Sequence, residues 1–188
     1  AEEGFGPSLT LAADSGIIGG IPLSGLDMGA AVNAEAELKM ADMFDICHGG
    51  GLDLCALGLA EIDAMGNVNV SKFHGRVTGP GGFIDLALMG TFTAGGLREH
   101  CEGGRLVIDR EGKYQKFKMD IEQVTFSGDY AAAHGQHVLV VTERAVFRLT
   151  PQGLMLTEIA LGVDLERDIL SQMEFRPLIA DDLQLMDG

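Results

Sequence analysis

Residues 145–159 read AVFRLTPQGLMLTEI, and this stretch predicts a β-hairpin. Two apolar runs, at 145–149 and 154–159, flank a polar tetrapeptide that contains Pro151 and Gly153. Proline and glycine favour the tight turn that joins two antiparallel strands. A sheet in this half of the chain should therefore contain antiparallel neighbours.

Upstream of this hairpin, apolar segments alternate with turn signals. Residues 8–13 and 52–62 are expected to form buried strands, and residues 68–71 alternate as in a strand with one polar face. Between the first two strands, Asn33 is a candidate N-cap for a helix over residues 34–43. Strands that alternate with helices predict an α/β domain.

The C-terminal half adds further short elements. A second hairpin is expected between residues 105–108 and 113–119, and Asp164 is a candidate N-cap for a helix. The tail from Pro177 should be irregular. The whole pattern predicts a layered α/β fold with a mixed sheet and C-terminal hairpins. No linker or repeat interrupts the chain, so residues 1–188 are expected to form a single domain.

The chain is acidic, with a formal net charge of −15 over 188 residues. Nucleic acids and anionic membrane surfaces bind clustered lysine and arginine, so neither is an expected partner. No apolar run approaches the roughly 20 residues that span a bilayer. The start lacks the basic and apolar regions of a secretory signal. We therefore expect a cytoplasmic protein.

The three cysteines, Cys47, Cys55 and Cys101, show no C-x-x-C spacing. An odd number of cysteines without such spacing argues against a disulfide framework and against a zinc site. Reduced cysteines and no bound metal are the expectation.

Glycine-rich motifs recur in a fixed order along nearly the whole chain. They are Ser15-Gly16-Ile17-Ile18-Gly19-Gly20, His48-Gly49-Gly50-Gly51-Leu52-Asp53, Gly66-Asn67-Val68-Asn69-Val70-Ser71-Lys72-Phe73, Gly79-Pro80-Gly81-Gly82-Phe83-Ile84-Asp85, Gly90-Thr91-Phe92-Thr93-Ala94-Gly95-Gly96 and Thr142-Glu143-Arg144-Ala145-Val146-Phe147. In order and spacing these motifs resemble the family I CoA-transferases of the acetate/propionate type, and specifically their glutamate-bearing second half. The resemblance implies that family's fold and the transfer of coenzyme A between a short-chain acyl-CoA (acetyl, propionyl or similar) and a free carboxylate. Coenzyme A is then a substrate, and no permanently bound cofactor is implied.

An aspartate stands where the family has its nucleophile. In such enzymes a glutamate carboxylate attacks the acyl-CoA thioester, and an enzyme–CoA thioester follows through a mixed anhydride. The resemblance places this role on Asp14, which withdraws the carboxylate by on the order of 1.5 Å, one carbon–carbon bond. A misplacement of about 1 Å can cost roughly 10²-fold in rate. Asp14 could instead activate water as a general base for acyl-CoA hydrolysis, or simply cap a turn.

The resemblance also assigns hydrogen-bond donors for the tetrahedral intermediates. Asn67 corresponds to the family's amide donor, and a backbone N–H of Gly95 or Gly96 would supply the second. Without the family, Gly66-Asn67 reads as a β-turn, and the turn and donor roles can coexist.

Several residues are assigned to coenzyme A and its acyl group. The resemblance implies that glycine loops let the backbone approach the substrate, although the same loops could be merely tight connections. Lys72 lies in a small basic island with His74 and Arg76, which could contact a phosphate or carboxylate or form a solvated strand edge. The full set assigned to binding is Gly19, Gly20, Lys72, Gly79, Pro80, Gly81 and Gly82.

Adjacent Glu143 and Arg144 are expected to form an internal ion pair with a structural role.

The chain resembles only one of the two related halves that such enzymes need. The expected partners are acyl-CoA, a short-chain carboxylate and the missing N-terminal half, as a domain of the same chain or as a separate subunit, within an oligomer. Basic groups for the phosphates of coenzyme A would lie in that half. The alternative from another class is a catalytically silent subunit that binds coenzyme A or serves assembly.

Overall fold

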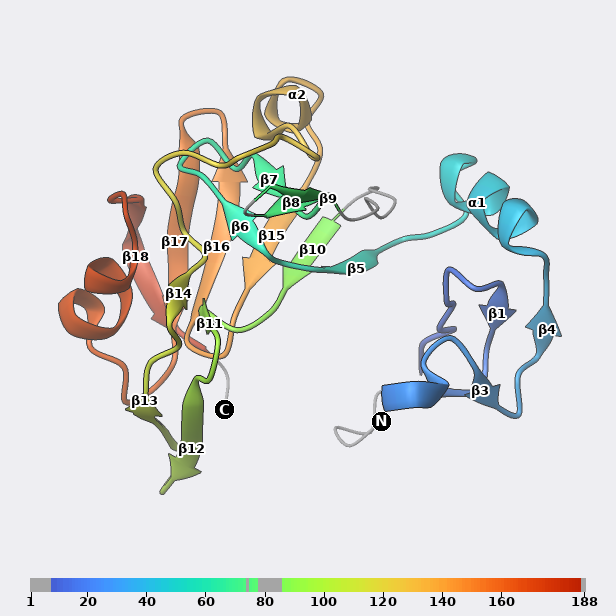
Figure 1. Cartoon of the computed structure of the whole chain (residues 1–188), viewed down its shortest axis with the longest axis horizontal. Coiled ribbons are helices and arrows are strands. Elements are labelled where there is room, and N and C mark those ends of the chain that lie inside the picture. The colour runs from blue at the N-terminus through green and yellow to red at the C-terminus, as the bar shows by residue number, and fades with distance from the viewer. Residues whose placement is uncertain (1–7, 74, 78–85, 187–188) are drawn as a thin grey trace. The chain divides into compact units, whose positions relative to one another are not determined.

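The computed structural model describes residues 8–73, 75–77 and 86–186 (Figure 1). The chain divides into two compact units, Ala1–Asp53 and Leu54–Gly188. The single domain expected for residues 1–188 stays a prediction.

A six-stranded sheet forms the body of the unit Leu54–Gly188 (Figure 1). From one edge to the other its strands are β5 (Cys55–Gly58), β10 (Leu86–Met89), β15 (Val138–Val141), β16 (Ala145–Thr150), β17 (Gly153–Ile159) and β18 (Leu178–Leu185). β5, β10 and β15 run parallel, β16 is antiparallel to both of its neighbours, and β18 is parallel to β17. The predicted mixed α/β sheet is confirmed, and its strands lie side by side in the order of the sequence.

The hairpin of β16 and β17 forms where the sequence predicts it. Leu149 pairs with Leu154 and Thr150 pairs with Gly153 across the turn. Gly153 has a φ of +115°, and a Cβ at this position would lie 2.5 Å from the carbonyl oxygen of Ala64. The turn conformation and the close approach of a neighbouring loop both require glycine here.

Three phenylalanine rings pack together in the core of this unit. The ring centroid of Phe117 lies 4.5 Å from that of Phe92 and 5.0 Å from that of Phe147. All three side chains are fully buried. Because they come from segments far apart in sequence, their contact fixes two loop segments onto strand β16.

Short two-stranded antiparallel ribbons complete this unit. They pair β6 (Glu61–Ile62) with β7 (Val68–Asn69), β8 (Lys72–Phe73) with β9 (Arg76–Val77), β11 (Thr93–Ala94) with β14 (Tyr114–Gln115), and β12 (Arg98–Glu102) with β13 (Arg105–Arg110).

The hairpin predicted between residues 105–108 and 113–119 is wrong. β13 pairs instead with the strand before it, β12, through a turn at Gly103 and Gly104. These glycines have φ values of +58° and +74°. Two consecutive residues with positive φ form the two-residue turn that best matches the twist of paired strands. The Gly-Gly signal therefore outweighs the turn predicted around residues 110–112.

Few helices occur in the described residues. In the unit Leu54–Gly188, α2 (Gly128–Ala133) begins after Ser127, whose hydroxyl accepts a hydrogen bond from the Tyr130 N–H at 3.3 Å. No helix in the described ranges is long and apolar enough to cross a bilayer.

The N-cap predicted at Asp164 is confirmed. Its carboxylate accepts a hydrogen bond from the Arg167 N–H at 2.8 Å. The segment that follows is a π-helical turn, η3 (Leu165–Ile169), continued by a 3₁₀ turn, η4 (Leu170–Gln172).

The last strand was not expected from the sequence. Residues after Pro177 form β18, which pairs along β17, and the Met186 N–H donates to the Ile159 carbonyl oxygen at 3.0 Å. Asp181 and Asp182 interrupt the apolar pattern of this segment, so main-chain pairing at the sheet edge decides its structure.

The described residues 8–53 of the unit Ala1–Asp53 form short antiparallel pairs, a 3₁₀ turn and one helix. Its elements are β1 (Ile17–Ile18) paired with β4 (Ala36–Glu37), β2 (Ile21–Pro22) paired with β3 (Ala31–Val32), η2 (Gly25–Asp27) and α1 (Met40–His48). The strand predicted over residues 8–13 is wrong, because there only Ala12 makes a bridge, to Ile18.

The helix predicted over residues 34–43 is also misplaced. Asn33 does not cap it but adopts a left-handed conformation with a φ of +56°, which asparagine tolerates better than most residues. The chain then returns along β1 as strand β4, so the helix begins only at Met40.

Candidate active site

Asp14 lies at the exposed tip of a tight turn in the unit Ala1–Asp53. The Gly16 N–H donates to the Ala13 carbonyl oxygen at 2.9 Å, and the Ala13 N–H donates to the Ile17 carbonyl oxygen at 2.8 Å. Gly16 has a φ of +106°, and a Cβ there would lie 2.2 Å from the Leu38 carbonyl oxygen. Glycine after Asp14-Ser15 is therefore required for this turn, on which Asp14 is exposed.

Gly19 and Gly20 follow directly after β1. Both have positive φ, and Cβ atoms would lie 2.7 Å from the Glu35 side chain and 2.5 Å from the Val32 carbonyl oxygen, respectively. Close approach of the unit's own chain already explains both glycines. Their role in binding coenzyme A stays a prediction.

Asn67 closes the loop between β6 and β7, in the unit Leu54–Gly188. Its side-chain Nδ2 donates to Asp63 Oδ2 at 2.9 Å, and its Oδ1 accepts from the Gly128 N–H at the start of α2 at 3.0 Å. The Asp63 carboxylate also accepts from the Asn67 backbone N–H at 2.9 Å. The amide thus holds the loop, and one of its two Nδ2 hydrogens makes no hydrogen bond within the described residues.

Gly95 and Gly96 form the turn between β11 and β12, with φ values of +82° and +103°. Their carbonyl oxygens accept from the Lys113 N–H at 3.5 Å and from Arg110 Nε at 2.9 Å. β14, the partner of β11, leads into the segment that lies against β6, where the Ile62 N–H donates to the Lys116 carbonyl oxygen at 2.9 Å. Their role as a second donor beside Asn67 stays a prediction.

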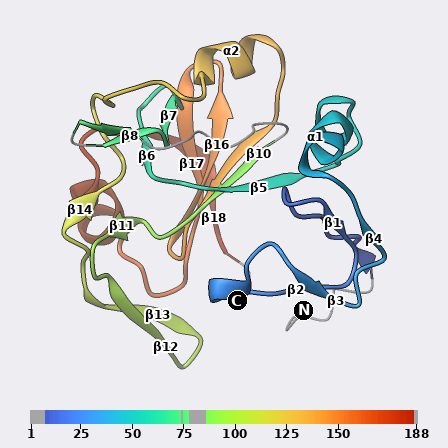
Figure 2. The same ribbon diagram turned by 45° about the vertical axis from the view of Figure 1, so that its right-hand side comes forward.

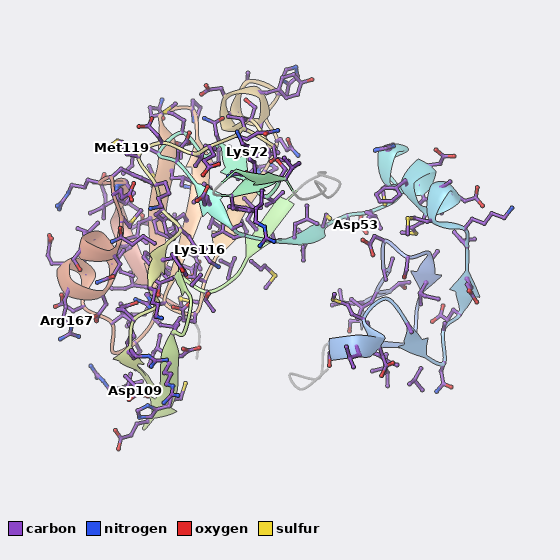
Figure 3. All side chains as sticks on the ribbon, in the orientation of Figure 1. Asp53, Lys72, Asp109, Lys116, Met119 and Arg167 are labelled. Atoms are coloured by element: carbon purple, nitrogen blue, oxygen red, sulfur yellow. The ribbon has the colours of Figure 1, made fainter. Side chains whose placement is uncertain are left out.

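Lys72 lies in β8, where its main chain is held by Asn69 (Figure 3). Asn69 Nδ2 donates to the Lys72 carbonyl oxygen at 2.6 Å, and the Lys72 N–H donates to Asn69 Oδ1 at 3.1 Å. Gly79, Pro80, Gly81 and Gly82, with His74, lie outside the described residues.

The main charged cluster of the described residues surrounds Arg144, which is fully buried. Its Nε lies 2.7 Å from Glu143 Oε1, so the predicted internal ion pair is confirmed. A second carboxylate, from Glu111, lies 2.6 Å from Arg144 Nη1, and the guanidinium sits 5.0 Å from the centre of the Phe92 ring. Nη1 also donates to the Asp168 carbonyl oxygen at 3.0 Å. No sequence motif marks Glu111 or Asp168 as partners of Arg144, because both reach it only through the folded chain.

Lys116, labelled in Figure 3, is a buried lysine whose charge is influenced by the Glu143 carboxylate of this cluster. Burial removes water from its ammonium and lowers the pKa of Lys116, and the Glu143 carboxylate partly opposes that shift. Nζ makes no hydrogen bond within the described residues and lies 3.1 Å from the position that a Cβ on Gly90 would take. The described residues therefore replace only part of the hydration that the Lys116 ammonium loses on folding.

Replacing Lys116 by methionine should raise the free energy of unfolding at pH 7 by on the order of 1 kcal/mol. Because folding lowers the pKa of Lys116 from 10.5, the charged ammonium destabilises the folded state below the lowered pKa. This penalty disappears as the pH rises towards the pKa of the unfolded chain. Urea unfolding of the two proteins should therefore show an advantage of the variant that shrinks from pH 7 to pH 10.

Lys118→Met is the matched control for this prediction. Lys118 pairs with Glu174 at 2.6 Å nearer the surface, so its loss should bring no gain in stability. An advantage of Lys116→Met that does not change with pH would contradict the proposed cause.

Pockets on the described part of the unit Leu54–Gly188 include two with well-defined linings. The larger, of about 470 Å³, lies between β13 and η3 and is lined in part by Arg110, Glu111, Arg167 and Asp168. Arg167 contacts both carboxylate oxygens of Asp168 at 2.7 Å and holds the pKa of that carboxyl below its usual range. None of the described residues assigned to catalysis or to coenzyme A lines either pocket. Among the described residues, no cluster of His, Cys, Asp and Glu is arranged to hold a metal ion.

No protein-family model matches the sequence. Curated relatives do match. The chain is 47% identical to acetate CoA-transferase YdiF of Escherichia coli strain K12, over 99% of the chain and 36% of the relative. It is 45% identical to caffeate CoA-transferase of Acetobacterium woodii, over 100% of the chain and 38% of the relative. It is 32% identical to acetate CoA-transferase subunit beta of E. coli strain K12, over 98% of the chain and 76% of that subunit.

A solved structure shows the same relationship. The acyl-CoA transferase YdiF of E. coli O157:H7, crystallised as a thioester complex with CoA, is 46% identical and superposes with a TM-score of 0.90, over 99% of this chain and 36% of that chain. The present chain thus spans little more than a third of the length of the first relatives and about three quarters of a beta subunit. It belongs to the family I CoA-transferases and corresponds to their C-terminal half.

Proposed function

We propose that the whole protein containing this chain transfers coenzyme A between a short-chain acyl-CoA and a free carboxylate, with Asp14 as the group that carries coenzyme A. The observation that carries the proposal is the exposed carboxylate at the tip of the 13–16 turn, in a chain of a CoA-transferase family. A relative with 46% identity forms a thioester complex with CoA, which supports a covalent route.

The proposed chemistry balances without a proton donor. A carboxylate oxygen of Asp14 attacks the thioester carbonyl carbon, the carbon–sulfur bond breaks, and coenzyme A leaves as a thiolate. The thiolate then attacks the aspartyl carbonyl carbon of the mixed anhydride and releases the donor acid as a carboxylate. An acceptor carboxylate then attacks the aspartyl thioester and releases the CoA thiolate. The thiolate attacks the acceptor's carbonyl carbon in the new mixed anhydride, which frees Asp14 and releases the acceptor as a new acyl-CoA.

Each step passes through a tetrahedral oxyanion that needs a donor. The remaining Nδ2 hydrogen of Asn67 is suited to this role because the amide is already held by Asp63 and Gly128. The N–H groups of Gly95 and Gly96 also donate to no acceptor within the described residues, so they remain proposed donors. Gly19, Gly20, Lys72 and the loop Gly79-Pro80-Gly81-Gly82 remain the proposed contacts of coenzyme A.

The other half of the protein is proposed to complete the cleft. Coenzyme A carries several phosphate charges, whereas this chain has a net charge of −15. The basic groups that bind the phosphates are therefore assigned to the part of the relatives that this chain does not cover, on the same chain or on a second subunit. We expect an oligomer.

Acyl-CoA hydrolysis is the second candidate function, and the short side chain of Asp14 favours it. The missing methylene leaves room for a water molecule between carboxylate and thioester. A carboxylate in that position can act as general base for the water. The products would be a free acid and coenzyme A, with no need for an acceptor.

One experiment separates these functions. The whole protein is incubated with propionyl-CoA, treated with borohydride, and the peptide containing Asp14 is analysed by mass spectrometry. Transfer predicts an aspartyl thioester that borohydride reduces to homoserine, and a prior addition of acetate should discharge it as acetyl-CoA. Free coenzyme A without acetate and without modified peptide would establish hydrolysis. Coenzyme A binding with neither product, or reduction of a different carboxylate, would overturn the proposal.

A further inference from the structure

The ribbon of β12 and β13 has a free edge. Figure 1 and Figure 2 show it extending away from the six-stranded sheet. All residues of β12 are exposed, and among the described strands β12 pairs only with β13. A two-stranded ribbon is marginally stable in water, and an unpaired strand edge is a template for another strand.

The pairing shows which main-chain groups face this edge. The Leu106 N–H donates to the Leu161 carbonyl oxygen at 2.8 Å, so the main chain of Leu106 is directed away from β12. In an antiparallel pair, two opposite residues either both direct their N–H and C=O groups towards the other strand or both direct them away from it. Cys101, the partner of Leu106, therefore directs its N–H and carbonyl to the free edge of β12, and so does Glu99 two residues before.

We propose that β12 pairs with β12 of a second copy of the chain, antiparallel and centred on His100. The outward groups of Glu99 and Cys101 would then bond to those of Cys101 and Glu99 in the other copy. The result is a four-stranded sheet with a two-fold axis, in which the same surface serves both copies.

The charged residues of β12 favour the register centred on His100 over the neighbouring registers. With His100 at the centre, Arg98 of each copy lies opposite Glu102 of the other, twice per interface. If the pairing were centred on Glu99, the Glu99 carboxylates of the two copies would lie opposite each other, which is unfavourable. Centring on Cys101 would leave Arg98 opposite Gly104. Only the central register pairs both charged ends of the strand.

The composition of the ribbon also suits contact between two acidic molecules. Arginines at 98, 105 and 110 balance the acidic residues at 99, 102 and 109, so residues 98–110 are formally neutral. The chain as a whole carries −15. Two copies therefore avoid most of their mutual repulsion when they meet at this ribbon.

The first test is a charge exchange in the whole protein, read as mass in solution by light scattering. Arg98→Glu sets glutamates opposite each other twice and should weaken the contact by about tenfold or more, so the assembly dissociates to half its mass on dilution. Adding Glu102→Arg to that variant restores opposite charges and should restore the mass. Arg148→Glu, on exposed β16 surface, makes the same change in net charge and should have no effect.

Unfolding of the ribbon cannot explain the expected loss. Arg98 lies opposite Arg110 within the ribbon itself, so Arg98→Glu replaces a like-charge pair by an opposite one there. Arg98→Glu should therefore increase the stability of the isolated ribbon while it weakens the contact between copies.

The second test fixes the register. His100 would face its own copy in a non-hydrogen-bonded pair, in which Cα atoms are roughly 4.5 Å apart, within the range that a disulfide spans. His100→Cys should therefore give a disulfide-linked pair of chains on mild oxidation, and Arg105→Cys should not. An unchanged mass for Arg98→Glu together with no cross-link through His100→Cys would overturn the proposal, and would indicate that the rest of the protein covers this edge.

Discussion

Lengthening Asp14 to glutamate should increase CoA transfer by about 10²-fold. The added methylene moves the carboxylate towards the position that the family's nucleophile occupies, and the gain should appear in kcat because the reacting atom, not the binding surface, is displaced. Removing the nucleophile with Asp14→Asn should abolish transfer and the borohydride-reducible adduct. The assay follows acetyl-CoA formed from propionyl-CoA and acetate by the whole protein.

Asp27→Glu is the matched control for the Asp14 variant. Asp27 is an exposed aspartate of the same unit, in η2, and gains the same methylene without any assigned role. A hydrolase would respond in the opposite way, because Asp14→Glu would fill the space for water and lower the release of coenzyme A without acceptor. Transfer that is unchanged in both Asp14→Glu and Asp14→Asn would remove Asp14 from the mechanism.

Replacing Arg144 by methionine should destabilise the unit Leu54–Gly188 by about 3–5 kcal/mol. The guanidinium is fully buried and neutralises Glu143 and Glu111, so its loss leaves carboxylates that are largely withdrawn from water and without their cation. Urea unfolding followed by circular dichroism measures the change. The midpoint should fall sharply, whereas Arg148→Met, on the exposed side of β16, should leave it nearly unchanged.

A double variant tests the cause of this loss. Glu111→Gln removes one of the two carboxylates, so Arg144→Met combined with Glu111→Gln should be more stable than Arg144→Met alone. If the double variant loses the sum of the two single effects, the loss would come from packing against Phe92 and not from unpaired charge.

Local chemistry explains which elements were predictable. The turn at Pro151 and Gly153 joins two apolar runs, so the hairpin β16–β17 is encoded within fifteen residues and was predicted closely. The cap at Asp164 is equally local, since its carboxylate bonds a main-chain group three residues later.

The wrong predictions share a different origin. β14 finds its partner in β11, some twenty residues upstream, and β18 forms because the edge of β17 is available. Asn33 looks like a helix cap by residue type, but its left-handed conformation serves the return of the chain along β1. Pairing between segments distant in sequence determines these elements. The local pattern of residue types contains no information about which distant segments pair.

The candidate site was predictable only in part, for the same reason. Motif order points to Asp14 and Asn67. The Asn67 amide holds its loop through Asp63 and Gly128, whereas its donor role stays a prediction. The buried lysine at 116 and the second carboxylate of the Arg144 cluster depend on long-range packing, and no motif marks them.

The strand order of the six-stranded sheet has a consequence for biosynthesis. Since neighbours in space are also neighbours in chain order, every strand from β10 onward can add to an existing edge as the polypeptide leaves the ribosome. No strand has to insert between two that are already joined. Until β18 emerges, however, the growing sheet presents the backbone of β17 to other nascent chains, so truncation before Leu178 should increase aggregation.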